Sequence, residues 1–353
     1  GVGVRGFRLG MRVRTVRDQQ APQAVLPATG SDTRLLTPDT RLPTPDTRLP
    51  TPDTRHPLPV FRLRHEGFLF ILPALIFFAL FVVYPIIYIV RASLLDWNGL
   101  SAGTWVGLDN YRKLFTADPV FIKTIRNAGL WIVFTIVPQM FLGFALAVLL
   151  NGPIFGRTIY RAIFYLPAII SPIVIGIIWQ RIYNPFGGLI SDFARGVNLP
   201  WLAKPYLADP GMATMAIIAV NVWQWTGFSM LLYLAGLQGL PAEVLEAATI
   251  DGATPFQRLR QVVWPMLRPV HLTLILLGLI GALQTFPLVF VLTKGGPNNA
   301  SQTMPTYIFQ QAFQLSSMGY GAAISVVLLV VALVASLGQM RFLGSRFVVG
   351  EGD

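Results

Sequence analysis

The chain has 353 residues, of which 54% are hydrophobic and only 12% are charged, and its mean hydropathy is +0.59. This composition excludes an ordinary soluble domain of the same length. The absence of cysteine excludes disulfides, thiolate catalysis and cysteine-ligated metals, and we expect no metal site and no cofactor, because the three histidines are scattered. The net charge of +11 indicates cationic loops beside a membrane rather than a nucleic-acid partner, since no soluble segment carries a basic stripe with interleaved aromatic residues.

Residues 1–60 are predicted to form a disordered, low-complexity tail. Three heptapeptides that begin with Thr-Pro-Asp-Thr-Arg start at Thr37, Thr44 and Thr51, and the prolines in each of them forbid a coiled-coil helix. Low apolar content with much Pro and Thr favours disorder. The repeat and the initial Gly1 favour an upstream extension or a misassigned start over a functional tail.

Six apolar runs follow, and each is long enough to cross about 30 Å of hydrocarbon. None of them contains Lys, Arg, Asp or Glu, and internal prolines predict kinks in several. We therefore expect an all-α membrane protein in which residues 61–345 form one six-span domain. The predicted spans are 68–90, 127–150, 162–180, 213–237, 270–293 and 321–340.

A polar, charged insert at 240–269 separates the fourth and fifth runs, and its local chemistry predicts a helix–turn–helix. Pro241 suits a first helical turn, and residues 242–250 are mostly good helix formers. Gly252 is expected in the left-handed conformation that ends a helix. Residues 254–257 fit a capping box that starts a second helix, which Pro265 and Pro269 are expected to end. These features alone also fit an ordinary amphipathic hairpin between two spans.

The order of residues in this insert is more specific than its caps. Glu246-Ala247-Ala248, then Asp251-Gly252-Ala253, then Pro265 resembles the cytoplasmic coupling loop of ATP-binding cassette (ABC) importer permeases. The segment 165–190 resembles the third span and outer turn of the sugar-type permeases, and residues 292–297 resemble their short motif after the fifth span. The resemblance covers about residues 65–345. Leu259, Trp264 and Pro287 depart from that pattern, which makes an inference about the substrate from it unsafe.

The resemblance implies a six-span type I (MetI-like) permease subunit of a binding-protein-dependent importer in the bacterial plasma membrane, with both termini in the cytoplasm. Its expected partners are a second homologous permease, two ATP-binding subunits, an extracytoplasmic solute-binding protein, membrane lipid and a sugar or oligosaccharide. We expect no enzyme activity in the chain itself. The segment nearest to a phosphate-binding loop, 152–158, is one residue short between its glycines and has Arg157 where that loop needs Lys.

The resemblance assigns contact with the ATPase to Glu246, Ala247, Ala248, Asp251, Gly252 and Pro265. The substrate pathway is predicted from the spans themselves, because polar amides are costly in hydrocarbon and tend to face a bundle interior or a cavity. The fourth span carries Asn221, Gln224, Trp225, Phe228 and Ser229 at helical spacing, and the fifth offers Gln284, Thr285 and Phe286. Hydrogen bonding and aromatic packing between helices would explain the same residues.

Two alternatives to sugar import stay open at this point. The chain could be an ABC permease for another solute, such as an amino acid or a peptide. It could also be a sodium-coupled secondary transporter, whereas proton coupling usually needs an ionisable group at membrane depth, and the predicted spans have no Lys, Arg, Asp or Glu.

Overall fold

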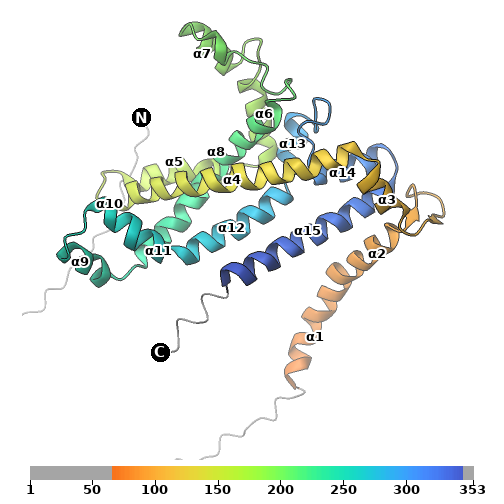
Figure 1. Ribbon diagram of the computed structural model, residues 1–353, viewed down its shortest axis with the longest axis horizontal. Helices are drawn as coiled ribbons and strands as arrows, with labels where there is room; N and C mark the ends of the chain where they lie inside the picture. The colour runs from red at the N-terminus through yellow and green to blue at the C-terminus, as the bar shows by residue number, and fades with distance from the viewer. Residues whose placement is uncertain (1–65, 345–353) are drawn as a thin grey trace, which may run out of the picture. The chain divides into compact units, whose positions relative to one another are not determined.

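The computed structural model describes residues 66–344, and the predicted tail at 1–60 lies outside this part of the chain. The described part is built from helices, several of them long and packed along one another, with a single short antiparallel strand pair (Figure 1). From the first helix to the fourth, the elements are α1 (Glu66–Phe78), η1 (Ala79–Val83), α2 (Tyr84–Ala92), β1 (Leu95–Asp96), β2 (Thr104–Trp105), α3 (Asp109–Thr116) and α4 (Pro119–Asn151).

The remaining elements alternate long helices with short ones. They are α5 (Arg157–Ile169), α6 (Pro172–Ile182), α7 (Leu189–Gly196), η2 (Pro200–Leu202), α8 (Ala213–Gln238), α9 (Ala242–Ile250), α10 (Pro255–Gln257), η3 (Arg258–Val263), α11 (Trp264–Met266), α12 (Arg268–Leu283), α13 (Pro287–Leu292), α14 (Met304–Phe309), η4 (Gln310–Gln314) and α15 (Met318–Gly344).

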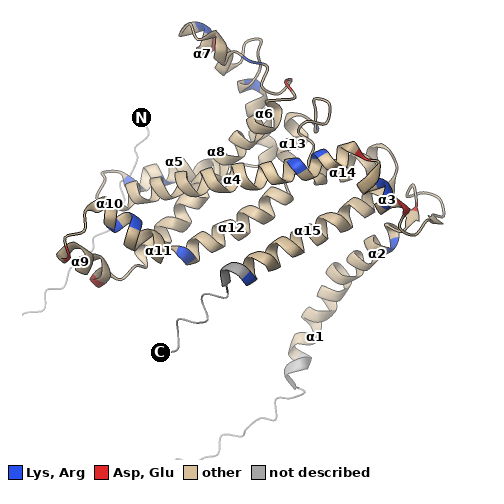
Figure 2. Ribbon diagram, viewed as in Figure 1, with Lys and Arg blue, Asp and Glu red and all other residues tan. Residues whose placement is uncertain are grey.

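The helices of residues 66–344 confirm an all-α membrane fold. Four stretches are long and apolar enough to cross a membrane, namely Phe70–Ala92, Pro119–Asn151, Ala213–Gln238 and Met318–Arg341, and the number rises to six if each of two bent helix pairs is one span. Lys, Arg, Asp and Glu lie towards the helix ends and in the connections, so the long helices are almost free of charge along their middle (Figure 2). This distribution is typical of membrane-spanning helices.

Two of the predicted spans are each divided between two helices. The run at 162–180 is broken at Ile170–Ser171, where α5 and α6 meet at a bend of 97°. Pro172 lacks the backbone N–H that would continue α5, and it restricts Ser171 to an extended conformation. The run at 270–293 is broken at residues 284–286, directly before Pro287, so that α12 and α13 are separate helices.

Small residues allow the helices that surround α8 to approach it closely. A Cβ atom at Gly143 of α4 would lie 2.6 Å from Cβ of Ser229, and one at Gly227 would collide with the carbonyl oxygen of Phe164 in α5. Lipid chains are as apolar as large side chains, so burial of apolar surface does not by itself drive helices together in a membrane. Close packing at small residues is therefore a main source of helix–helix affinity. The glycines therefore set how tightly α8 packs against α4 and α5.

At the end of α4 farthest from the charged insert, one carboxylate joins distant parts of the chain. Asp118 caps α4 by accepting hydrogen bonds from the backbone N–H groups of Val120 and Phe121. Its other oxygen accepts from the hydroxyls of Tyr307 in α14 and Tyr320 in α15, both at 2.6 Å. The carboxylate thereby links α4, α14 and α15.

The first apolar helix contrasts with the rest of the described bundle. No side chain from Phe70 to Arg91 is buried, although α2 runs beside α15. α4 and α8, in contrast, have ten and thirteen buried residues, respectively. The first span therefore contributes little to the core of its own chain.

Candidate functional site

The charged insert folds as a helix, a turn and a second helix, as the sequence predicts. At the end of α9, the N–H of Ala253 bonds the carbonyl of Ala248 and the N–H of Gly252 bonds that of Thr249, which is a Schellman motif. Gly252 has φ +78°, so the predicted left-handed conformation is confirmed. The predicted capping box is also present, because Thr254 and Gln257 exchange hydrogen bonds at the start of α10.

The predicted end of the second helix is wrong in detail. Pro265 lies inside the helical stretch that runs from Pro255 to Met266, and the bend of 63° comes two residues after Pro265, at Leu267. The π-helical turn η3 ends at Val263, two residues before Pro265. It shifts the hydrogen-bond pattern, so that the backbone N–H of Trp264 donates to the carbonyl of Leu259. Pro269 then sits in the first turn of α12, where a missing N–H costs little.

The insert presents both charged and apolar side chains on its surface. Glu246, Asp251 and Gly252 are exposed, and the Arg258 guanidinium donates to the Thr249 hydroxyl at 2.9 Å, which joins the two helices. Ile250 and Phe256 flank the turn and are 87% and 69% exposed, respectively. Sequence reasoning missed these two residues, although each is a bulky apolar side chain beside the turn.

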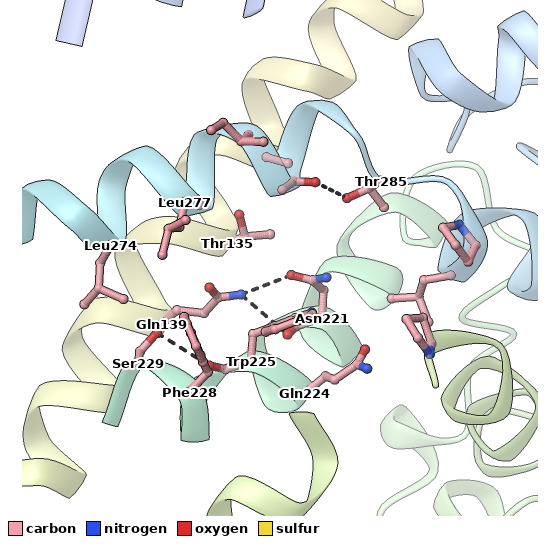
Figure 3. A pocket seen from close by; sticks show the side chains of 17 residues that line it. Thr135, Gln139, Asn221, Gln224, Trp225, Phe228, Ser229, Leu274, Leu277 and Thr285 are labelled. Atoms are coloured by element: carbon pink, nitrogen blue, oxygen red, sulfur yellow. Dashed lines mark hydrogen bonds between the residues drawn. The ribbon is translucent and has the colours of Figure 1, made fainter. Parts of the chain in front are cut away.

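A cavity of about 380 Å³ lies between α4, α8, α12 and α13 (Figure 3). It collects the predicted face of α8, because Asn221, Gln224, Trp225, Phe228 and Ser229 all line it. Thr285, from the break after α12, lines it as well, and none of the lining side chains is ionisable. The remaining lining residues are Thr135, Gln139, Pro172, Leu274, Leu277, Gly278, Ile280, Gly281, Ala282, Pro287 and Leu288.

Two polar residues of α4 complete this wall, and sequence reasoning missed both. Gln139 donates from Nε2 to Oδ1 of Asn221 at 3.0 Å, as Figure 3 shows, and Thr135 lies nearby on the same helix. Both lie in the second predicted span, whose amides and hydroxyls could have been screened in the same way as those of α8. The pair Gln139–Asn221 holds two amides in fixed positions at the edge of the cavity.

Gln224 combines a structural contact with an unused acceptor. Its side chain is 1% exposed, and Nε2 donates to the carbonyl of Ile170 at 3.2 Å, at the break between α5 and α6. Its Oε1 is buried and has no hydrogen-bond partner among the described residues. A buried polar atom without a partner is costly, so the site is suited to a donor such as a hydroxyl group.

Gln284 and Phe286, which were predicted to belong to the pathway, do not line this cavity. Gln284 is exposed at the end of α12. Phe286 stacks on Phe290 with ring centroids 5.2 Å apart and also contacts Phe309. The chain leaves the helix after Leu283, so the side chains of 284–286 no longer follow the helical spacing of α12, and only that of Thr285 reaches the cavity.

Comparison with known proteins gives a consistent result. The family model described as "Binding-protein-dependent transport system inner membrane component" matches residues 139–347. A probable ABC transporter permease protein of Bacillus subtilis, YurN, is 37% identical over 278 residues, covering 78% of this chain and 94% of the relative. The diacetylchitobiose uptake system permease protein NgcF of Streptomyces coelicolor is 34% identical over 290 residues, covering 78% of this chain and 81% of the relative.

Among solved structures, a bacterial ABC transporter involved in the import of the acidic polysaccharide alginate superimposes with a TM-score of 0.70. That alignment covers 80% of this chain and 97% of the other, at 23% identity, and it shows that the fold is shared. The three aligned proteins each cover 78–80% of this chain and are themselves covered to between 81% and 97%. The chain therefore belongs to the binding-protein-dependent transport system inner membrane components, the membrane-spanning permease subunits of ABC importers.

Proposed function

We propose that this permease carries a sugar or oligosaccharide, and that the cavity between α4, α8 and α12 is part of its path. The observation that carries the proposal is the wall of the cavity. Neutral amides and hydroxyls from Gln139, Asn221, Gln224 and Thr285 face it beside the ring of Trp225. Such a wall suits the hydroxyl edges and apolar faces of a sugar ring, and a relative is named for diacetylchitobiose uptake.

The insert at 240–269 is proposed as the contact with an ATP-binding subunit. Glu246, Ala247, Ala248, Asp251 and Gly252 lie at or near its exposed turn, and Pro265 lies in its last helix. Ile250 and Phe256 supply apolar surface that a groove on the ATPase would cover. ATP hydrolysis is assigned to that separate subunit. On the same ground we propose that the insert and both chain termini lie in the cytoplasm.

The remaining partners follow from the same assembly. A second, homologous permease would cover apolar surface such as that of residues 70–91, which this chain leaves uncovered. Two ATPases would bind the two permeases, and an extracytoplasmic solute-binding protein would deliver the sugar. Family membership removes the sodium-coupled alternative, while an amino acid or a peptide remains the competing substrate class.

The proposal is tested by uptake in cells that lack the native gene and carry Gln224→Leu. Loss of one buried hydrogen bond should raise the half-saturating sugar concentration several-fold to roughly tenfold. Gln339→Leu is a matched control, because Gln339 also donates from Nε2 to a neighbouring helix, at 2.8 Å to the Leu272 carbonyl, and its Oε1 likewise has no hydrogen-bond partner within residues 66–344. It does not line the cavity.

Uptake is measured for a panel of sugars, amino acids and peptides and normalised to the amount of assembled complex. An altered half-saturating concentration in Gln224→Leu alone supports the path. Equal effects of the two variants, confined to the amount of complex, would assign Gln224 to helix packing. Uptake of an amino acid or peptide in place of sugars would overturn the substrate class.

A further inference from the structure

One histidine joins the two sides of the bend at the end of the insert. His271 lies in the first turn of α12, just after the 63° bend, and is 9% exposed. Its Nε2 lies 3.0 Å from the carbonyl oxygen of Trp264, which belongs to the last helix of the insert. The two rings are also in contact, with centroids 4.2 Å apart.

The second ring nitrogen reaches a different span. Nδ1 of His271 lies 2.8 Å from the hydroxyl of Tyr233 in α8, a side chain that is completely buried. Because a carbonyl oxygen can only accept, Nε2 must carry a hydrogen, which leaves Nδ1 of a neutral ring to accept from the Tyr233 hydroxyl. One imidazole therefore connects the insert to α8 through two directed hydrogen bonds.

The two helices that His271 connects, α8 and α12, also line the cavity about one helical turn away from the imidazole. Tyr233 follows Ser229 by four residues on α8, and His271 precedes Leu274 by three residues on α12. Residues three or four apart share one face of a helix. Since Ser229 and Leu274 both line the cavity, a displacement of the imidazole is passed to the cavity wall along two helices.

Trp264 extends the contact to α4, which carries the second predicted span. Its ring packs edge-on against Phe144 of α4, with centroids 4.9 Å apart, and Phe144 in turn meets Tyr233 at 5.4 Å. The last helix of the insert is thus in contact with α4, α8 and α12 through one aromatic cluster. Packing alone would need only an apolar side chain at 271, whereas the two hydrogen bonds fix the distance and the orientation between elements on opposite sides of the bend.

We propose that His271 is a positioning residue, which passes displacement of the insert to the cavity-lining faces of α8 and α12 through its hydrogen bonds to Trp264 and Tyr233. The inference rests on the proposed function, in which the insert contacts an ATP-binding subunit, and it adds that ATP hydrolysis displaces the insert. It concerns the link between ATP hydrolysis and movement of the sugar, and it assigns His271 no contact with the sugar itself.

The test uses the complete transporter in liposomes, with its solute-binding protein, and measures sugar transported per ATP hydrolysed. His271→Leu fills the space of the ring without hydrogen bonds, and it should lower this ratio about threefold to tenfold, as expected for loss of buried hydrogen bonds. Tyr233→Phe removes a single hydroxyl and should lower the ratio by less. His271→Gln, whose amide can still donate to the Trp264 carbonyl, should recover part of the loss.

Thr273→Val is the matched control on the same helix. The Thr273 hydroxyl donates to the carbonyl of Pro269 in the same helix, so this hydrogen bond does not cross the bend and the variant should keep the wild-type ratio. A wild-type ratio in both His271→Leu and Tyr233→Phe, or a loss of assembled complex with no change in the ratio, would overturn the inference alone. Absence of ATP-driven uptake by the wild-type complex would overturn the proposed function, and this inference with it.

Discussion

At the scale of single residues, Gly252 is needed for its backbone conformation and not because space for a side chain is lacking. A Cβ atom added there meets no heavy atom within 4 Å, so space is available for a side chain. The φ of +78° is nevertheless unfavourable for any residue with a Cβ, by about 1–2 kcal/mol for the left-handed conformation. A substitution therefore acts on the turn between α9 and α10 and not on the core.

We expect Gly252→Val to insert into the membrane at normal levels while sugar uptake falls strongly, because a β-branched residue resists this turn. Gly252→Asn should keep most of the uptake, since Asn tolerates the left-handed conformation better than other residues. Uptake per membrane-inserted protein, measured for both variants, checks the expectation. Wild-type uptake by the Val variant, with an ATPase still bound, would refute the coupling role of this turn.

Asp118 offers a test that depends on pH. Burial alone would raise the pKa of its carboxyl, but hydrogen bonds from Tyr307, Tyr320 and the amides of Phe121 and Val120 outweigh burial and hold the pKa below its ordinary value. A carboxyl whose pKa is lower in the folded state stabilises the fold above its unfolded pKa, which is about 3.9. That contribution is lost as the pH falls through the folded value.

The thermal stability of the purified protein should accordingly decrease as the pH falls below about 4. Asp118→Asn should be less stable at pH 7 and should show a weaker decrease on acidification. Tyr307→Phe, which removes one charge-assisted hydrogen bond, should cost about 1.5–3 kcal/mol at neutral pH. Melting curves across this pH range provide the measurement, and equal slopes for wild type and Asp118→Asn would contradict the assignment.

At the scale of helices, the glycine contacts around α8 predict a clear asymmetry between two substitutions. Gly227→Ala places a Cβ against the backbone of α5 at Phe164, and forcing the helices apart should cost about 1–3 kcal/mol. Gly129→Ala, on α4, meets nothing within 4 Å and should be neutral or slightly stabilising, because Ala favours the helix. The yield and melting temperature of detergent-solubilised protein compare the two variants. Equal behaviour would mean that α5 can move away from α8 without cost.

The helices also show which features a sequence can reveal. The caps around Gly252 and the polar face of α8 depend on residues a few positions apart, and they were predictable for that reason. Gln139 joins that face only because α4 packs along α8, and its partner Asn221 lies 82 residues later in the sequence. The two tyrosines that donate to Asp118 lie 189 and 202 residues away in the sequence, so no local sequence pattern predicts these hydrogen bonds.

The breaks in the spans lie between these two cases. Pro172 and Pro287 indicated kinks, but the size of each bend depends on what receives the freed backbone groups. At Ile170 the carbonyl accepts from Gln224, so a residue of α8 stabilises the break between α5 and α6. Composition and proline spacing do not encode such a contact, and the predicted spans at 162–180 and 270–293 therefore do not correspond to single helices.

At the scale of the whole molecule, the outermost feature is the first span, in which no side chain from Phe70 to Arg91 is buried. In the proposed assembly a second permease covers part of this helix. A copy made in excess of its partner would then expose to lipid a surface that the assembled transporter hides. Proteases that degrade unassembled membrane proteins could recognise the surplus copy by this exposed surface. The cell could then match the numbers of the two permeases by degrading the surplus rather than by balancing their synthesis.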